Sequence, residues 1–166
     1  LLEHEQWQDI PLTSDWTSAV TGSGGVPLNV RSMQVDTGAT ATSTALRRTH
    51  SGGNWSIGQT RRFIDWSKRI SMAVIFCAEA GTANGQCRLL WGKANSGGPG
   101  NLTVRGIGFR IDNLALKGVC HDGTTLTVVD LATTLVTPIT HRLTVISDGL
   151  GNVEWYVDET SSGNCR

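Results

Sequence analysis

The run from His141 to Asp158, HRLTVISDGLGNVEWYVD, constrains the fold of this chain more than any other stretch. Its apolar side chains recur with a period of two on both sides of a central turn: Leu143, Val145, Val153, Trp155 and Val157. That period is typical of a strand with one buried face. The segment between them, residues 148–152, supplies the aspartate, glycines and asparagine that favour a tight turn. The run therefore predicts a β-hairpin.

Several other short runs read as strands, and they are separated by glycine, proline, asparagine and aspartate. The predicted strands cover residues 27–35 (with a bulge), 70–77, 87–91, 104–111, 114–120, 126–129 and 135–139. Turn signals every eight to twelve residues are typical of a β-sandwich. At 166 residues the chain is predicted to be one domain, 1–166, with residues 1–30 as an arm or a first strand.

Three of these runs, ISMAVIFC at 70–77, CRLLW at 87–91 and the meander from 104 to 129, lead to the 141–158 hairpin. Together, over roughly residues 70–158, they resemble the concanavalin A-like, laminin-G-like jelly-roll superfamily. The resemblance implies an all-β fold: an antiparallel jelly-roll β-sandwich. The chain departs from the pattern at Asp158-Glu159, where the family has Asp-Gly, and soon afterwards it ends. Members of the family normally continue through further strands that complete both sheets. We expect the N-terminal third of this chain to supply these closing strands. The alternatives are that the chain has been cut or that a neighbouring subunit supplies them.

The charge balance excludes some partners. The chain has 14 basic and 14 acidic residues and no net charge, so no overall field attracts a nucleic acid or an anionic membrane surface. No apolar run approaches the roughly 18 residues that span a bilayer. We therefore expect neither nucleic-acid binding nor membrane insertion.

The four cysteines contain no CxxC pair of the kind that zinc sites use. Cys77 and Cys87 flank a predicted hairpin loop and would face each other across two strands. Cys120 and Cys165 would then be the second pair, tethering the C-terminal tail to an inner strand. Four reduced thiols are the alternative. At least one disulfide is favoured, which predicts an extracellular, secreted or particle-surface location.

No catalytic signature is evident. Retaining glycosidases on this fold use two carboxylates on one strand face, about 5 Å apart, but here the acidic residues are scattered and stand mostly at turns. There is no GxSxG elbow. His50, His121 and His141 and the single tyrosine, Tyr156, are interpreted as structural rather than as a lyase pair or triad. The sequence thus predicts a protein that is not an enzyme.

Two kinds of binding site are candidates. Calcium, held by hard oxygen ligands, is common in the family that the chain resembles, and Asp112, Asn113 and Asp122 are the candidate ligands. Asp148 and Asn152 could also contribute, although each of these residues is also a normal turn residue. Exposed tryptophans stack on sugar rings. Trp55 and Trp91 stand at predicted loops or strand ends and are the candidate platforms, with core packing or an interface as the alternative.

The resemblance and the six tryptophans favour a non-catalytic, lectin-like carbohydrate-binding domain whose partner is a glycan or polysaccharide. The alternative is a structural surface module, such as a virion decoration, fibre or filament subunit, which would use the same sandwich to assemble with copies of itself or a neighbour. A polysaccharide-active enzyme is the third hypothesis.

Overall fold

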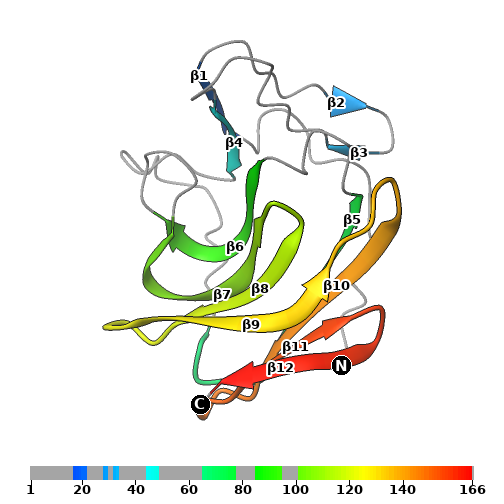
Figure 1. Cartoon of the computed structure of the whole chain (residues 1–166). Helices are drawn as coiled ribbons and strands as arrows, with labels where there is room; N and C mark the ends of the chain where they lie inside the picture. Colours follow the sequence, from blue (N-terminus) through cyan, green and yellow to red (C-terminus); the bar gives the residue numbers. More distant parts are fainter. Residues whose placement is uncertain are drawn as a thin grey trace. The chain divides into compact units, whose positions relative to one another are not determined.

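The computed structural model (Figure 1) divides into two compact units, Leu1–Arg61 and Arg62–Arg166. It describes residues 65–77, 85–94 and 101–165. In the first unit it describes the backbone of four short strands: β1 (Thr17–Thr21), β2 (Leu28–Asn29), β3 (Ser32–Met33) and β4 (Thr44–Arg48). β1 pairs with β4, and β2 pairs with β3. The predicted single strand over residues 27–35 is thus wrong, because β2 and β3 are two short strands that pair with each other. That residues 1–166 form one domain stays a prediction.

The second unit contains eight strands in two antiparallel four-stranded sheets, ordered β12-β11-β10-β5 and β6-β7-β8-β9. Their bounds are β5 (Ile70–Cys77), β6 (Gln86–Ala94), β7 (Leu102–Asp112), β8 (Ala115–His121), β9 (Leu126–Thr134), β10 (Thr140–Ser147), β11 (Val153–Val157) and β12 (Thr160–Cys165). No helix occurs among the residues that the structure describes. The prediction of an all-β sandwich is confirmed at this level.

The hairpin predicted at 141–158 is confirmed as β10 and β11. Leu143 lies opposite Val157 and Val145 opposite Trp155, so the apolar side chains share the inward face. The turn between the strands is closed by backbone hydrogen bonding from Asp148 to Asn152. The predicted strand at 70–77 also matches β5, which pairs with β10 on its other side.

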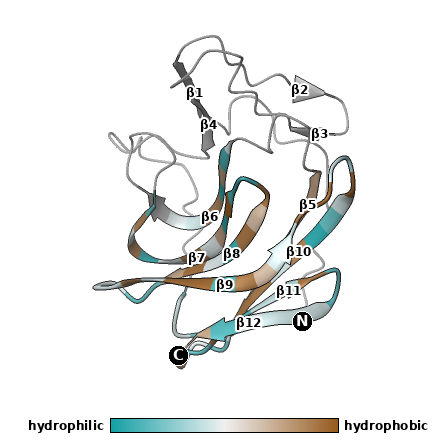
Figure 2. Cartoon of the chain, in the orientation of Figure 1, coloured by the Kyte–Doolittle hydropathy of each residue, from teal (hydrophilic) through white to brown (hydrophobic). Residues whose placement is uncertain are grey.

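Trp155 lies at the centre of the core, fully buried between the sheets. Its indole Nε1 donates a hydrogen bond to the carbonyl oxygen of Gly108 on β7, at 2.8 Å. A Cβ at Gly118 on β8 would clash with the indole ring, so only glycine allows this approach. In Figure 2 the hydrophobic colour runs along much of β8 and β9, whereas β12 is mostly white to teal. Tryptophan in one sheet and glycine in the other therefore fix the spacing between them.

The strand after β11 corrects the expectation about closing strands. β11 pairs with β12, the six residues that follow it directly, and the described strands of the first unit pair only with each other. The turn between β11 and β12 needs no glycine, because Asp158 and Glu159 themselves adopt positive φ values of 48° and 71°. Such φ values are uncommon outside glycine but occur in tight turns. The partner of β11 is thus the C-terminal segment rather than the N-terminal third.

Two further details differ from prediction. Residues 135–139 are not a strand; β9 extends to Thr134, and the chain then turns, with the Ile139 N–H donating to the carbonyl oxygen of Val136. β5 and β6 do not form a hairpin, because β5 belongs to the sheet of β10 and β6 to the sheet of β7. Strands that follow each other in the sequence often pair, but between β5 and β6 the chain crosses from one sheet to the other.

Candidate functional site

The two tryptophans predicted to bind sugar have different outcomes. Trp91 lies on β6 opposite the buried Ile107, and its partly buried side chain packs against the hydrophobic core. Its indole therefore contributes to the sandwich interior, as the alternative reading allowed. Trp55 lies outside the described residues. Sugar stacking by either residue stays a prediction.

Asp112, a predicted calcium ligand, lies among three basic side chains. Arg110 Nε is 2.6 Å from its carboxylate, Arg88 Nη1 2.9 Å and Lys117 Nζ 3.6 Å. The cations stand side by side because Arg88 pairs with Arg110, and Arg110 with Lys117, across three strands. Burial by itself would raise the pKa of Asp112, but the hydrogen bond from Arg110 and the positive charge of the adjacent Arg88 bring that pKa below its usual value. This carboxylate is already neutralised by protein cations.

Asp122, another predicted calcium ligand, is not close to Asp112. The two flank opposite ends of the seven-residue strand β8, which at about 3.3 Å per residue puts roughly 20 Å between them. The Oδ1 atom of Asp122 accepts hydrogen bonds from the N–H groups of Thr124 and Thr125 and so holds its own turn. Asn113 is in the β7–β8 turn, with φ 50°.

The structure thus does not gather the three predicted ligands into one site. Within the described part of the chain no group of three or more His, Cys, Asp or Glu residues is arranged to hold a metal ion. Calcium binding stays a prediction.

The cysteines fall into two groups. Cys120 on β8 and Cys165 on β12 approach each other, with their Sγ atoms 2.6 Å apart. Cys77 and Cys87 lie on strands of different sheets, so the predicted arrangement across a hairpin is wrong. Cys77 Sγ contacts the carbonyl oxygen of Pro138 at 3.4 Å. Burial raises the pKa of Cys87 to about 11, which makes its thiol a poor nucleophile. No disulfide is formed among the four thiols.

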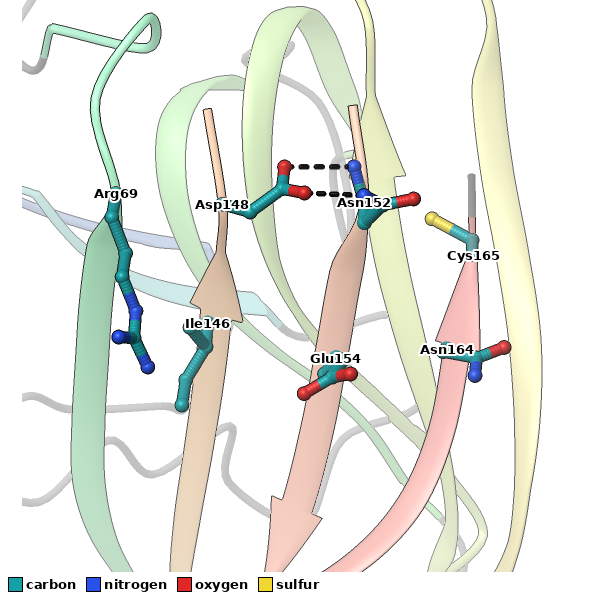
Figure 3. A pocket seen from close by; sticks show the side chains of 7 residues that line it. All are labelled: Arg69, Ile146, Asp148, Asn152, Glu154, Asn164 and Cys165. Atoms are coloured by element: carbon teal, nitrogen blue, oxygen red, sulfur yellow. Dashed lines mark hydrogen bonds between the residues drawn. The ribbon is translucent and has the colours of Figure 1, made fainter. Parts of the chain in front are cut away.

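A hollow of about 510 Å³ lies on the outward face of the β12-β11-β10-β5 sheet, at the end formed by the β10–β11 turn (Figure 3). Its volume is within the range of small-ligand sites, about 300–1,000 Å³. The floor is a row of directly opposed residues on three adjacent strands: Ile146 on β10, Glu154 on β11 and Asn164 on β12. Arg69 precedes β5 on one side, and Cys165 ends β12 on the other.

The turn that borders the hollow is held by Asp148. Its Oδ1 accepts the N–H groups of Leu150 at 2.7 Å and Asn152 at 3.0 Å, and its Oδ2 accepts the side-chain amide of Asn152. The hydrogen bond from the Asn152 side chain, followed by that from the Leu150 N–H, lowers the pKa of Asp148. Asp148 is therefore ionised at neutral pH, with both oxygens occupied, and it shapes the rim of the hollow.

The remaining polar groups of the hollow have capacity for a ligand. Glu154 uses Oε2 to accept the hydroxyl of Tyr156, at 2.6 Å, on the same face of β11. This hydrogen bond is the main cause of a raised pKa for Tyr156. No described residue bonds to the guanidinium of Arg69 or to the side-chain amide of Asn164. An acceptor, a donor and an amide that does both are thus arranged around Ile146.

The sequence analysis does not select Glu154, which is one of the scattered acidic residues, nor does it select Arg69, Ile146 or Asn164. The alternation of residues 143–157 already assigns Ile146 and Glu154 to the outward face. Asn164 could not be found in this way, because its position opposite Glu154 depends on β12, which has no apolar alternation.

The histidines are not combined with the tyrosine. His141 Nδ1 lies 2.8 Å from Asp158 Oδ2, and His121 Nδ1 accepts the N–H of Gly123 at 3.0 Å. His141 is on the inward face of β10 with Leu143, whereas Tyr156 points outward. The geometry offers no tyrosine–histidine pair in the part of the chain that is described.

The fold and the hollow define the chain, as far as it is described, as an all-β protein with two packed antiparallel sheets and a polar depression on one outer face. Comparisons with protein-family models, with curated proteins and with solved structures find no match. The described residues contain no helix that is long and apolar enough to cross a membrane.

Proposed function

We propose that this chain is a non-catalytic, lectin-like carbohydrate-binding domain with a concanavalin-like jelly-roll fold, working outside the cell or on a particle surface. A glycan or polysaccharide is the partner, bound in the hollow on the outer face of β5, β10, β11 and β12. The observation that carries the proposal is the row of Ile146, Glu154 and Asn164, with Arg69 beside it and the ring of Tyr156 on the same face.

The chemistry of these groups suits a sugar. Each hydroxyl of a sugar both donates and accepts hydrogen bonds, and here Glu154 accepts, Arg69 donates and Asn164 does both. The sugar's C–H groups need apolar area, which Ile146 supplies in the hollow.

The acidic groups of the hollow favour binding over hydrolysis, the activity that the third hypothesis requires. A glycosidase needs one carboxylic acid with a raised pKa as proton donor and a second carboxylate as base or nucleophile. Asp148 has a lowered pKa, and its oxygens already accept three hydrogen bonds. It is therefore unsuited to be the proton donor, and Glu154 is left without a carboxylate partner for the reaction.

A glycan array followed by calorimetry tests the proposal. We expect saturable binding by the wild-type chain and a loss of tenfold or more in affinity for Glu154→Gln and Asn164→Ala. The first replaces a charged acceptor by an amide, and the second removes an amide of the floor. Glu159→Gln is the matched control, because Glu159 is 80% exposed in the β11–β12 turn. Unchanged affinity in both floor variants would remove the hollow as the site. Loss of binding in Trp55→Ala instead would move it to that tryptophan.

One observation favours the alternative, a structural surface module that assembles with copies of itself. Ile75 is 64% exposed on the edge strand β5, and Val136 and Ile139, 52% and 50% exposed, lie in the turn leading into β10. Exposed edges with apolar side chains favour association. Sedimentation over a wide concentration range separates the hypotheses, since assembly without glycan binding supports the module.

A further inference from the structure

We propose that Cys120 and Cys165 form a reversible thiol–disulfide site that locks the last strand, β12, onto the opposite sheet. We further propose that this lock controls the hollow, a part of the inference that rests on the proposed glycan-binding function. The observation behind it is the juxtaposition of the two thiols, 45 residues apart in sequence and on strands of different sheets.

Both side chains lie on the inner faces of their sheets. Cys120 pairs with the buried Ile107 on β7, and Cys165 pairs with the buried Val153 on β11, so each shares the face of its buried neighbour. The two sheets face each other here, and the Sγ atoms are 2.6 Å apart. To form a bond, the two sulfur atoms have to approach by about half an ångström.

β12 is the element whose order depends most on such a bond. It is an edge strand with one hydrogen-bonded neighbour, its sequence is TSSGNC, and none of its side chains is fully buried. The pairing with β11 is interrupted by a bulge between Trp155 and Tyr156. Apart from that ladder, β12 lies against the opposite sheet, where Gly163 is close to the side chain of Leu131 on β9. Strands with few buried contacts open locally at low free-energy cost.

A small-molecule disulfide such as oxidised glutathione is the oxidant in the exchange. Either Cys120 or Cys165 loses its proton and attacks a sulfur of this oxidant, which releases one thiol and leaves a mixed disulfide. The other cysteine then loses its proton and attacks the protein sulfur of the mixed disulfide. The second thiol leaves, so two protons and two electrons have passed from the protein to the oxidant.

The proposed disulfide is connected to the hollow through Asn164, the residue next to Cys165. Cys165 lines the hollow, and its neighbour Asn164 stands opposite Glu154 on the floor. In the disulfide form the end of β12 is fixed, and Asn164 is held in place to bond a ligand. In the dithiol form the end of β12 has the pairing seen here, with Asn164 opposite Glu154, but it can open more often. Asn164 is then in place for a smaller share of the time, and the ligand binds more weakly.

The experiment equilibrates the full chain in glutathione buffers from reducing to oxidising, then alkylates it and maps disulfides by mass spectrometry. Amide hydrogen exchange of residues 160–165 and thermal melting are followed in parallel. We expect a Cys120–Cys165 crosslink in oxidising buffer, slower exchange in β12 and a melting temperature higher by roughly 10 °C, as for disulfides of comparable loops. Cys120→Ser and Cys165→Ser should resemble the reduced form in every buffer, while Cys87→Ser should respond as the wild type does.

The outcomes separate the two parts of the proposal. If no Cys120–Cys165 crosslink forms, or if it forms and leaves the exchange of β12 unchanged, the lock is refuted. If the lock forms but a glycan binds equally well to both redox forms, control of the hollow is refuted. If β12 responds but neither form binds any glycan, the lock stands and the proposed function fails.

Discussion

Trp155 and Tyr156 are adjacent in the sequence but have opposite environments. Trp155 is fully buried and bonded to the Gly108 carbonyl on the other sheet, whereas Tyr156 lies on the outer face and donates to Glu154. Because a strand sends successive side chains to opposite faces, one residue belongs to the core and the next to the candidate site. The effects of substituting the two should therefore separate cleanly.

We expect Trp155→Phe to lower the free energy of unfolding by about 2–4 kcal/mol, because it leaves the Gly108 carbonyl without a partner and a void in the core. Tyr156→Phe should change it by less than about 0.5 kcal/mol, since that hydroxyl is at the surface. Chemical denaturation of both variants checks this. Equal losses would contradict the assignment of the two faces.

Asp112 supports a second prediction at the same scale. Asp112→Asn should destabilise the fold by about 2–4 kcal/mol, because it leaves the guanidinium of Arg88, whose side chain is only 8% exposed, without a compensating charge. Glu159→Gln breaks the ion pair with Arg142, whose partners are 54% and 80% exposed, and should cost about 0–1 kcal/mol. Urea titration measures both, and a larger loss for Glu159→Gln would overturn the reasoning.

Trp155 and Asp112 show which side-chain environments can be predicted from the sequence and which cannot. The inward position of Trp155 follows from alternation within a single run. The environment of Asp112 depends on the register of three strands, which places Arg88, Arg110 and Lys117 in one row. Local sequence carries no such information, so the aspartate was interpreted as a turn residue and a calcium ligand.

At the scale of elements, the strands with strong alternation were predicted and the pairing between distant strands was not. β5, β7, β8 and the β10–β11 hairpin lie where the pattern put them. β12 gave no signal, because TSSGNC has neither apolar alternation nor β-branched residues beyond Thr160. It forms because β11, with an otherwise unpaired edge, directly precedes it. Asn164 of the hollow was missed for this reason.

The exposed edge of β5 carries the prediction at this scale. Ile75→Lys should leave the free energy of unfolding within about 0.5 kcal/mol of the wild type, because the side chain is 64% exposed. A charge on an edge strand also opposes edge-to-edge pairing. Sedimentation should therefore show less association for the variant if the chain assembles through β5. Association that is unchanged would place the contact elsewhere.

For the molecule as a whole, acid stability depends on a set of aspartates. Hydrogen bonds lower the pKa of Asp122, Asp148 and Asp158 below the usual value of 3.8, led by the Thr125 N–H, the Asn152 side chain and the Arg142 N–H respectively. A carboxylate whose pKa is lower in the folded state stabilises the fold above its unfolded pKa. That stabilisation is lost as the pH falls through the folded value.

We therefore expect the melting temperature to be nearly constant from pH 7 to pH 5 and to fall below about pH 4. Asp122→Asn and Asp158→Asn together should melt at a lower temperature at pH 7 and show a shallower acid decline. Differential scanning fluorimetry across this range measures both effects. A wild-type decline that begins near pH 6 would point to histidines instead.

The place of β5 at the edge of its sheet also has a consequence for the order of folding. Ile70 pairs with Ser147 and Cys77 with Thr140, so β5 has no partner in its own sheet until β10 has been reached much later in the chain. The β6–β9 meander, in contrast, pairs each strand with the next. During synthesis the meander can assemble before β5 finds its partner. Until then the apolar side chains of β5 are exposed to solvent: Ile75 and the inward-facing Met72, Val74 and Phe76. Closure of this long loop is the costly step, because non-local strand pairing gives up chain entropy before it gains contacts.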